Sequence, residues 1–521
     1  MSETAYVRTE MIGQKPPPAG QSGPVLWMRK NLFSGWFSTV LTLAGVFAVL
    51  AIIYWALPWF LHGVWNAKSL GECRQIVAAT WGENASGACW AVIRERWNQF
   101  LFGFYPSDQY WRPTLTFCLM IAAVLPVLFF DNRKVSQWVI GTMALVGALV
   151  FYGLSTPAEI AIQIIAIFYV IFVLAAVAPR RLLWVTALFP AAGFWLLWGG
   201  SLWTPVSVLV GLGLVIFTLS AVSARSGLLW AGVVAFALFV CLFLNPFRLA
   251  ESLTSMLAYL VTFGQWRISP SFSIWIGGTD ITGWLPLHGF LSSVLQSLAP
   301  LSLPHVDSDR FGGFLLAEVI GVTAIVVALP LGIILALGRK SDMPLVKMLC
   351  VGFIEFVRGV PLITMLFTAS LLLQYFLPPQ TQFDLILRVI ILVTLFSAAY
   401  IAEVVRGGLA ALPRGQYEAA DALGLDYWQA QRFIIMPQAL KISIPGIVSS
   451  FIGLFKDTTL VAFVGLMDPL KGVTQIVRAD INWKGIYWEP YIFVGAIFFI
   501  FCFGMSRYSM YLERRLKRDH R

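Results

Sequence analysis

The chain has 521 residues, of which 59% are hydrophobic and only 12% are charged. Soluble domains carry about 25% charged residues, so this composition excludes a chain that folds mainly in contact with water. The net charge is +10, but Lys and Arg gather in short loops and at the chain ends. The positive-inside rule explains that placement without a nucleic-acid partner.

Apolar runs long enough to cross a bilayer recur along the whole chain. A membrane-spanning helix needs about 20 mostly apolar residues. The runs do not alternate as barrel strands do, and a backbone in lipid must satisfy its own hydrogen bonds, so each run predicts a helix. Seven runs lie near 36–62, 113–130, 136–154, 157–179, 182–200, 204–223 and 227–246, and five more near 312–338, 345–376, 384–410, 443–466 and 488–511.

These runs predict an all-α fold, a polytopic transmembrane helical bundle of about 12 spans. We expect an N-terminal transmembrane region of about seven spans over 36–246, and a second group of five spans that ends near residue 511. Between the two groups, 247–311 contains several prolines and polar residues. It is expected to be a long loop outside the membrane, with room for a short surface helix.

The short loops on one side of this bundle carry the basic residues. They are Arg133-Lys134, Arg180-Arg181, Arg225 and Arg339-Lys340. Because basic short loops remain in the cytoplasm, residues 1–35 and the basic tail 512–521 are expected to be cytoplasmic. The loops 63–112 and 247–311 are then extracytoplasmic.

The six cysteines divide into two kinds. Cys73 and Cys89 share one polar segment between two predicted spans. If that segment is extracytoplasmic, a disulfide between them is one possibility, and two free thiols are the other. The remaining four lie in apolar runs, where cysteine acts as a small buried hydrophobic residue. Neither the cysteines nor the four scattered histidines have the spacing of a metal site.

A polar stretch, 406–445, interrupts the last five spans. Residues 416–423 are good helix formers, and Gly424 can end that helix by taking a left-handed conformation. A second amphipathic piece is expected from about 427 to 436. Two short helices with a glycine elbow at the inner membrane face can dock into a partner's groove, or merely connect two spans.

Two prolines follow this second piece. Pro437 and Pro445 are expected to bracket the return of the chain to the membrane, because proline disturbs the interior of a helix.

The polar stretch also carries a long motif. Glu418-Ala419-Ala420 is followed after three residues by Gly424, and after nine more by Ile434-Ile435-Met436-Pro437. This pattern resembles the EAA loop of ABC-importer permeases, which reads E-A-A, three residues, G, nine residues, I-x-L-P. Met436 stands where leucine is usual and keeps an apolar, flexible side chain.

Sequences on either side resemble the polar amino-acid branch of these permeases. The matching pieces are 355–362, 400–408, 415–416 and 455–460. Three further pieces are similar to the larger permease of general L-amino-acid importers, and they are 88–93, 102–106 and 506–516. The core resemblance covers about 310–521, whereas the N-terminal half matches only in patches.

The resemblance implies a five-helix type I ABC-importer core over 312–511, with a cytoplasmic coupling loop over 411–440. In that family the loop inserts into a cleft on a cytoplasmic ATPase dimer. The residues expected to make this coupling are those of the motif, namely Glu418, Ala419, Ala420, Gly424, Ile434, Met436 and Pro437.

The chain itself is expected not to be an enzyme. It lacks the phosphate-binding pattern G-x-x-x-x-G-K-[ST], because no Lys follows a Gly anywhere, and it shows no nucleophile–base arrangement. The resemblance therefore implies that this chain binds no cofactor, and that ATP and Mg are held by the partner ATPase.

The other partners implied by the resemblance are a second, related permease subunit, a periplasmic amino-acid-binding protein and the lipid of a bacterial inner membrane. The function implied is import of L-amino acids by alternating access. An ion-coupled secondary transporter is the alternative, but such proteins often contain two similar halves, and here seven dissimilar spans precede five. A membrane scaffold or receptor that only docks a partner is a third reading.

Ionisable residues within spans are costly and usually face a cavity or a partner. An amino acid presents a carboxylate and an ammonium, so Arg388 or Lys456 can receive the first, and Glu318 or Asp457 the second. Thr458, the neighbour of Asp457, joins these substrate-pathway candidates. The alternatives are that Lys456 and Asp457 pair with each other or cap a broken helix, and that Arg388 snorkels to the outer interface.

Two pairs near the inner face have i, i+3 spacing, which brings side chains together on a helix. Glu355 with Arg358, and Glu403 with Arg406, are therefore expected to be structural ion pairs.

Overall fold

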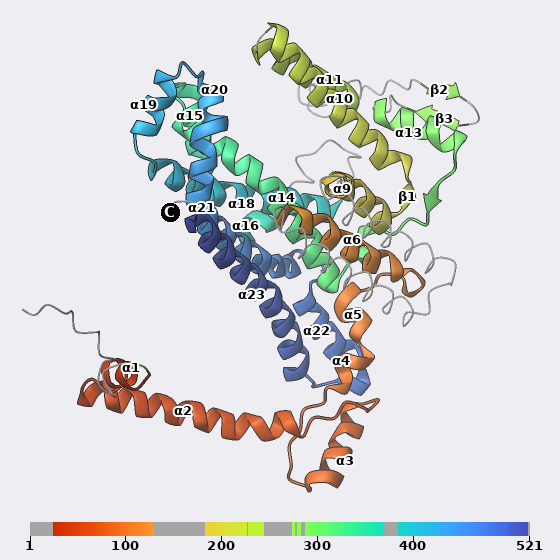
Figure 1. Ribbon diagram of the computed structural model, residues 1–521. Helices are drawn as coiled ribbons and strands as arrows, with labels where there is room; N and C mark the ends of the chain where they lie inside the picture. The colour runs from red at the N-terminus through yellow and green to blue at the C-terminus, as the bar shows by residue number, and fades with distance from the viewer. Residues whose placement is uncertain are drawn as a thin grey trace, which may run out of the picture. The chain divides into compact units, whose positions relative to one another are not determined.

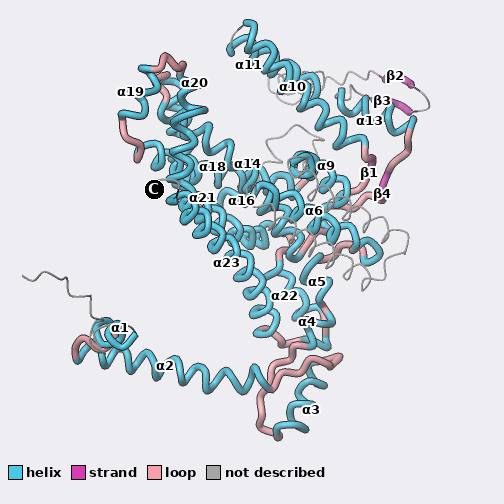
Figure 2. Tube along the Cα trace, in the orientation of Figure 1, coloured by secondary structure: helices cyan, strands magenta, loops and turns pink. Residues whose placement is uncertain are grey.

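The computed structural model describes residues 24–128, 183–226, 228–243, 273–276, 279–282, 287–368, 370 and 384–518. The chain divides into two compact units. Unit 1 comprises 1–95 with 477–490, and unit 2 comprises 96–476 with 491–521. Figure 2 shows that helices account for most of the described chain and that its strands form only two short pairs.

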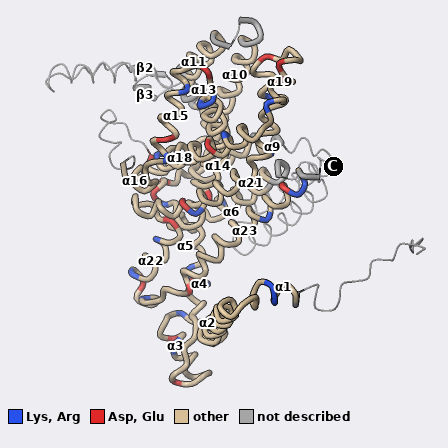
Figure 3. The backbone as a smooth tube through the Cα atoms, turned by 90° about the vertical axis from the view of Figure 1, so that its left-hand side faces the viewer, with Lys and Arg blue, Asp and Glu red and all other residues tan. Residues whose placement is uncertain are grey.

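Unit 1 contains one long apolar helix and a folded polar segment. Helix α2 has no charged residue, as its uniform tan colour in Figure 3 shows, and none of its side chains is buried. A helix that is apolar all round needs lipid or other protein around it. The helices of this unit are α1 (Pro24–Asn31), α2 (Trp36–Leu61), α3 (Leu70–Trp81), α4 (Ala91–Glu95) and the 3₁₀ turn η7 (Ile481–Trp483).

The first part of unit 2 consists of helices and two short antiparallel pairs of strands. Helix α6 packs on α9, and α10 packs on α11 and α13. The helices are α5 (Trp97–Phe102), η1 (Ser107–Gln109), α6 (Trp111–Leu128), α9 (Leu183–Trp198), α10 (Trp203–Ser226), α11 (Leu228–Phe243), α13 (Leu287–Leu298) and η3 (Ser308–Arg310). Strand β1 (Gly200–Ser201) pairs antiparallel with β4 (Ser302–Leu303), and β2 (Ser273–Ile276) with β3 (Thr279–Thr282).

The second part of unit 2 is a bundle built around two parallel helices, α14 and α18 (Figure 1). One buried apolar cluster joins the first halves of these helices, and another joins their second halves with α15 and α21. The elements are α14 (Gly313–Lys340), α15 (Pro344–Gly359), α16 (Leu362–Phe367), α18 (Leu385–Ala410), α19 (Gly415–Ala422), α20 (Tyr427–Ala430), η5 (Gln431–Ile435), α21 (Met436–Asp457), η6 (Thr458–Val464), α22 (Pro469–Ala479) and α23 (Trp488–Arg518).

The all-α, membrane-spanning class is confirmed. Within the described residues, six helices are long and apolar enough to cross a membrane, and two shorter apolar helices, 188–198 and 230–239, accompany them. The six are Trp36–Leu61, Trp203–Val222, Gly313–Lys340, Leu385–Ala410, Tyr427–Val464 and Trp488–Leu516. The spans expected near 136–154 and 157–179 lie outside the described residues.

The span expected over 345–376 is not one helix. Helix α15 ends at Gly359, Val360 is extended, and Pro361 precedes the short helix α16. The residue before a proline is pushed out of the helical region, and proline has no N–H to donate. The Val360-Pro361 pair therefore interrupts the helix that its apolar composition predicted.

The second piece of the polar stretch also differs from the expectation. Residues 427–457 form one continuous helix, in which Gln431–Ile435 is a π-helical turn and Pro437 and Pro445 lie within α21. Pro437 cannot donate to the carbonyl four residues earlier, and a wider π turn directly before it accommodates that lost bond. The two prolines therefore lie within a continuous helix and do not interrupt it.

Close helix packing depends on glycines that face a neighbouring helix. A Cβ at Gly332 of α14 would lie 2.6 Å from the Ile401 side chain of α18. A Cβ at Gly408 of α18 would lie 2.5 Å from the carbonyl oxygen of Ala439 of α21. Small residues allow helix backbones to approach closely in membranes, so these positions set the spacing of the core.

The adjacent pair Gly407 and Gly408 provides a test of this packing. Gly408→Ala is expected to destabilise the chain by about 1–3 kcal/mol, because the new methyl group overlaps the backbone of α21. Gly407→Ala places the same group where no atom lies within 4 Å and is expected to be neutral or slightly stabilising. Thermal unfolding of the full-length chain in detergent measures both, and equal stability of the two variants would contradict the packing.

Candidate functional site

The elbow in the polar stretch forms where helix α19 ends. Gly424 has a φ of +69°, in the left-handed region that favours glycine. Its N–H donates to the Asp421 carbonyl at 2.9 Å, and the Leu425 N–H donates to the Ala420 carbonyl at 3.2 Å. These two bonds are those of a Schellman motif, which satisfies carbonyls that the end of a helix leaves open.

A capping box begins the helix on the other side of the elbow. The Asp426 side chain accepts from the Gln429 N–H at 2.7 Å, and the Gln429 side chain accepts from the Asp426 N–H at 3.2 Å. This reciprocal arrangement satisfies two N–H groups at the start of α20. The elbow is therefore a defined turn between two capped helix ends.

One side of α19 is held against the rest of unit 2. The Lys340 ammonium, at the end of α14, donates to the Tyr417 hydroxyl at 2.7 Å and lies 4.2 Å from the centre of the Tyr417 ring. The Gln438 side chain of α21 donates to Gln416 at 2.9 Å. Ala420 is fully buried. Helix α19 is thus attached to both α14 and α21.

The other side of the elbow is uncovered in this chain. Leu423 is 73% exposed, and three large aromatic side chains near it are also exposed, namely Tyr427, Trp428 and Phe433. Exposed apolar groups gathered in one place usually mark an interaction site. We call these four residues the elbow surface.

The motif residues divide between the two sides. Glu418 and Ala419 are exposed on α19, and Gly424 is exposed at the turn. Ile434 and Met436 are half-buried and pack against the inner apolar cluster, while Pro437 is exposed near the start of α21. Glu418, Ala419, Gly424 and Pro437 are therefore exposed, whereas Ala420, Ile434 and Met436 pack the loop against the rest of unit 2.

Two of the substrate-pathway candidates make hydrogen bonds within the chain. Arg388 is buried, and its guanidinium donates to the Ser370 carbonyl at 2.7 Å. Thr458 is fully buried, and its hydroxyl donates to the Phe455 carbonyl at 2.8 Å.

The other candidates lie closer to open space. Lys456 is exposed, and Asp457 is half-buried at the point where α21 gives way to the 3₁₀ helix η6. Glu318 is half-buried, and its carboxylate has no hydrogen bond or ion pair among the described residues. It lies one turn before Gly321, where a Cβ would contact Phe455 and Thr458. Glu318 therefore lies one turn away from the place where α14 packs against Thr458 of η6.

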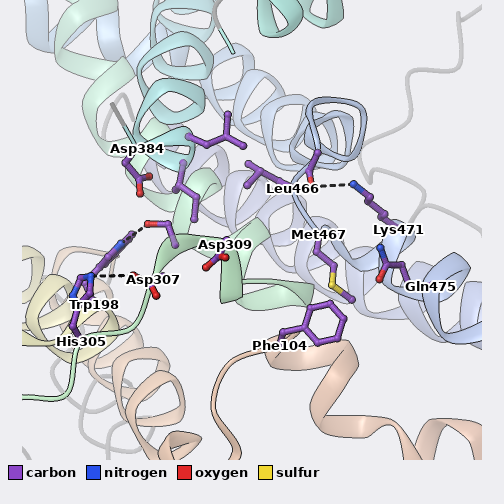
Figure 4. A pocket seen from close by; sticks show the side chains of 14 residues that line it. Phe104, Trp198, His305, Asp307, Asp309, Asp384, Leu466, Met467, Lys471 and Gln475 are labelled. Atoms are coloured by element: carbon purple, nitrogen blue, oxygen red, sulfur yellow. Dashed lines mark hydrogen bonds and ion pairs between the residues drawn. The ribbon is translucent and has the colours of Figure 1, made fainter. Parts of the chain in front are cut away.

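A cavity of about 490 Å³ lies within unit 2 where α14 and α18 begin (Figure 4). Its ionisable lining residues are the carboxylates of Asp307, Asp309 and Asp384, the Lys471 ammonium and the His305 ring. The sequence alone does not indicate these residues as a site, because His305, Asp307 and Asp309 come from the connection before α14, Asp384 directly precedes α18, and Lys471 lies in the first turn of α22. We call this space the charged cavity.

Hydrogen bonds hold the lining of the charged cavity. The Lys471 ammonium donates to the Gly465 carbonyl at 2.9 Å. The Asp384 carboxylate accepts from the Leu387 N–H at 3.1 Å, and the Trp198 indole donates to the Ser308 hydroxyl at 2.9 Å. The Lys471 ammonium keeps further donor capacity, and the Asp384 carboxylate keeps further acceptor capacity.

The wall that carries Trp198 is fixed by two buried side chains. The Arg112 guanidinium donates to the Leu196 carbonyl at 2.5 Å and to the Pro304 carbonyl at 2.9 Å. The Tyr105 hydroxyl donates to the Leu197 carbonyl at 2.8 Å, and burial raises the pKa of Tyr105 to about 12. The hydroxyl therefore keeps its proton, and this bond, throughout the physiological pH range.

The charged cavity and the elbow lie at opposite ends of the same helices. Asp384 precedes the first residue of α18, and Ala410, its last residue, leads into α19. A helix of 26 residues spans about 39 Å. Helix α14 likewise begins just after η3 at the cavity and ends with Lys340 at α19.

In unit 1 the two cysteines of the polar segment are joined. Cys73 and Cys89 form a disulfide with their Cα atoms 5.9 Å apart. The Cys89 N–H donates to the buried Glu489 carboxylate at 2.8 Å, at the start of α23. The disulfide segment is therefore tied to the first turn of the last long helix.

The i, i+3 ion pairs form only in part. Arg406 pairs with Glu403 at 2.5 Å, as expected. The pair of Glu355 with Arg358 is absent from the ion pairs of the described residues. Glu355 binds Arg339 at 2.8 Å and Arg358 lies 3.7 Å from Glu403, so each reaches another helix.

Comparisons with known proteins agree with this architecture. The family described as "Binding-protein-dependent transport system inner membrane component" matches residues 328–518. The chain is 57% identical to the glutamate/glutamine/aspartate/asparagine transport system permease protein BztC of Rhodobacter capsulatus, over 100% of both chains. It is 32% identical to the inner membrane amino-acid ABC transporter permease protein YhdY of Escherichia coli K12, over 97% of each.

The chain belongs to the family of amino-acid ABC transporter permeases. This finding confirms the resemblance carried by the motif, and a permease subunit is not itself catalytic. Both relatives share the N-terminal region. In contrast, the glutamate/aspartate import permease protein GltK of Escherichia coli O157:H7 aligns over 96% of its length with only 42% of this chain, at 32% identity.

Proposed function

We propose that this chain forms part of the translocation path of an importer that moves amino acids into the cytoplasm by alternating access, driven by a separate ATPase. The observation that carries the proposal is the arrangement of α14 and α18. These helices begin at the charged cavity and end at the elbow, so a force applied to the elbow acts on the helices that line the path.

The elbow surface supports an ATPase dimer as the partner. Helix α19 is attached to α14 and α21 on one side, while Leu423, Tyr427 and Trp428 project without cover on the other. A docking surface attached in this way can transmit movement. Because the sequence contains no phosphate-binding loop, ATP and Mg are held by the partner, on the cytoplasmic side with both chain termini.

The charged cavity supports the extracytoplasmic mouth of the path. It offers an ammonium for the carboxylate of an amino acid and carboxylates for its ammonium, as charge-assisted hydrogen bonds require. A periplasmic binding protein would deliver substrate there. The relative from Rhodobacter capsulatus is named for glutamate, glutamine, aspartate and asparagine, and we propose acidic amino acids and their amides as the substrates here.

A second permease subunit would complete the path. The uncovered apolar faces of the membrane-spanning helices, including the whole of α2, leave surface for this subunit and for lipid. The candidates for substrate contact farther along the path are Glu318, Arg388, Lys456, Asp457 and Thr458. Arg388 and Thr458 each make a hydrogen bond within the chain that leaves them further capacity.

Gly424→Val tests the coupling role of the elbow. A Cβ at this position meets no atom within 4 Å, so the substitution acts on backbone preference and not on packing. A left-handed conformation costs a non-glycine residue about 1–2 kcal/mol, and more when it is β-branched. In proteoliposomes containing the whole transporter, the variant is expected to hydrolyse ATP while accumulating at least about tenfold less amino acid than the wild type.

Gly424→Asn is the control, because asparagine tolerates the left-handed region. It is expected to keep most of the transport. Wild-type coupling in a stably assembled Gly424→Val transporter would overturn the proposal. So would uptake by the wild type that an uncoupler abolishes and ATP depletion leaves unchanged, since that result indicates an ion-coupled transporter.

Lys471→Gln tests the charged cavity. Loss of the ammonium is expected to raise the KM of amino-acid uptake about fivefold, with a smaller change in kcat, since one partly exposed charge-assisted contact is removed. Lys471→Arg should stay close to the wild type. Lys484→Gln, which alters an exposed lysine after α22 that does not line the cavity, is the matched control. A KM that is unchanged in Lys471→Gln would remove the cavity from the path.

A further inference from the structure

Glu403 lies at the centre of a charged cluster that joins three helices. One carboxylate oxygen is 3.1 Å from the Arg339 guanidinium of α14 and 3.7 Å from the Arg358 guanidinium of α15. The other oxygen accepts two bonds from Arg406 on α18 itself, at 2.5 and 2.6 Å. Arg339 also binds Glu355 of α15 at 2.8 Å.

The five charges of this cluster are not equivalent. Three arginines face two glutamates, so the cluster has a surplus of one positive charge. Glu403 contacts all three arginines and its side chain is 19% exposed, whereas Glu355 contacts one of them and is 55% exposed. Ion pairs that are partly shielded from water interact more strongly than exposed pairs.

Removing Glu403 therefore differs from removing any other member. Without its carboxylate, three guanidinium groups on three helices would share the single carboxylate of Glu355, and like charges held together repel. Without Arg358 or Arg406, Glu403 would keep two cations. The arginines can substitute for one another, but Glu403 has no substitute.

The cluster is connected directly to the elbow. Arg339, which binds Glu403, is followed by Lys340, which binds Tyr417 of α19 at 2.7 Å. Two consecutive residues at the end of α14, Arg339 and Lys340, therefore join the charged cluster to helix α19. Next to these charged residues, the apolar cluster that includes Ala336, Ala402 and Val405 packs α14 and α18 together.

We infer that Glu403 is a positioning residue for transport, which holds the inner ends of α14, α15 and α18 together so that they move as one body with α19. This inference rests on the proposed function. It adds that the force from the elbow reaches the bundle through charge contacts around one carboxylate, and not through α14 alone.

Glu403→Gln tests the inference, with Glu355→Gln as the matched control in the same cluster. In proteoliposomes containing the whole transporter, Glu403→Gln is expected to reduce the amino acid transported per ATP hydrolysed about tenfold, while ATP hydrolysis stays within about twofold of the wild type. Glu355→Gln should change the ratio less than twofold. A merely structural role would lower hydrolysis and transport together and leave their ratio unchanged.

A charge-conserving variant tests the same inference where Glu403→Gln assembles poorly. Glu403→Asp keeps a carboxylate among the three arginines, so it is expected to transport several-fold more amino acid per ATP hydrolysed than Glu403→Ala. An unchanged ratio in Glu403→Gln, or a ratio in Glu403→Asp no better than in Glu403→Ala, would overturn the inference. A wild-type complex that fails to transport would instead count against the proposed function.

Discussion

The proposed coupling depends on one backbone conformation, the left-handed turn at Gly424. Its positive φ lets the Gly424 and Leu425 N–H groups close the end of α19, so that the chain turns there before α20 begins, and Leu423 and Trp428 lie uncovered. Any residue with a Cβ resists this conformation. A straight connection over the same residues would offer neither a compact surface nor a place where force could be applied.

The rest of unit 2 connects that local turn to the helix bundle. Helix α19 is attached to the end of α14 by the contact of Lys340 with Tyr417, and α14 packs along α18 through positions such as Gly332. Both helices continue to the charged cavity, about 39 Å away by helix geometry. The elbow surface, where the ATPase is proposed to dock, and the charged cavity, where the amino acid is proposed to bind, therefore lie at opposite ends of α14 and α18.

What the sequence could predict was local, and what it missed was tertiary. The elbow follows from short-range rules, because the spacing of Glu418 and Gly424 and the capping chemistry of the turn lie within a dozen residues. The charged cavity could not be predicted, since Asp307, Asp384 and Lys471 meet only after folding. For the same reason, i, i+3 spacing suggested that Arg358 pairs with Glu355, whereas the guanidinium reaches Glu403 on another helix.

Docking of the elbow surface can be measured with Leu423→Cys and a membrane-impermeant maleimide. We expect labelling from the cytoplasmic side only, in inside-out vesicles, and protection from labelling when the ATPase subunits are assembled on the membrane. Labelling from the opposite side, or a labelling rate that is the same with and without the ATPase, would contradict the claim that a cytoplasmic ATPase binds the elbow surface.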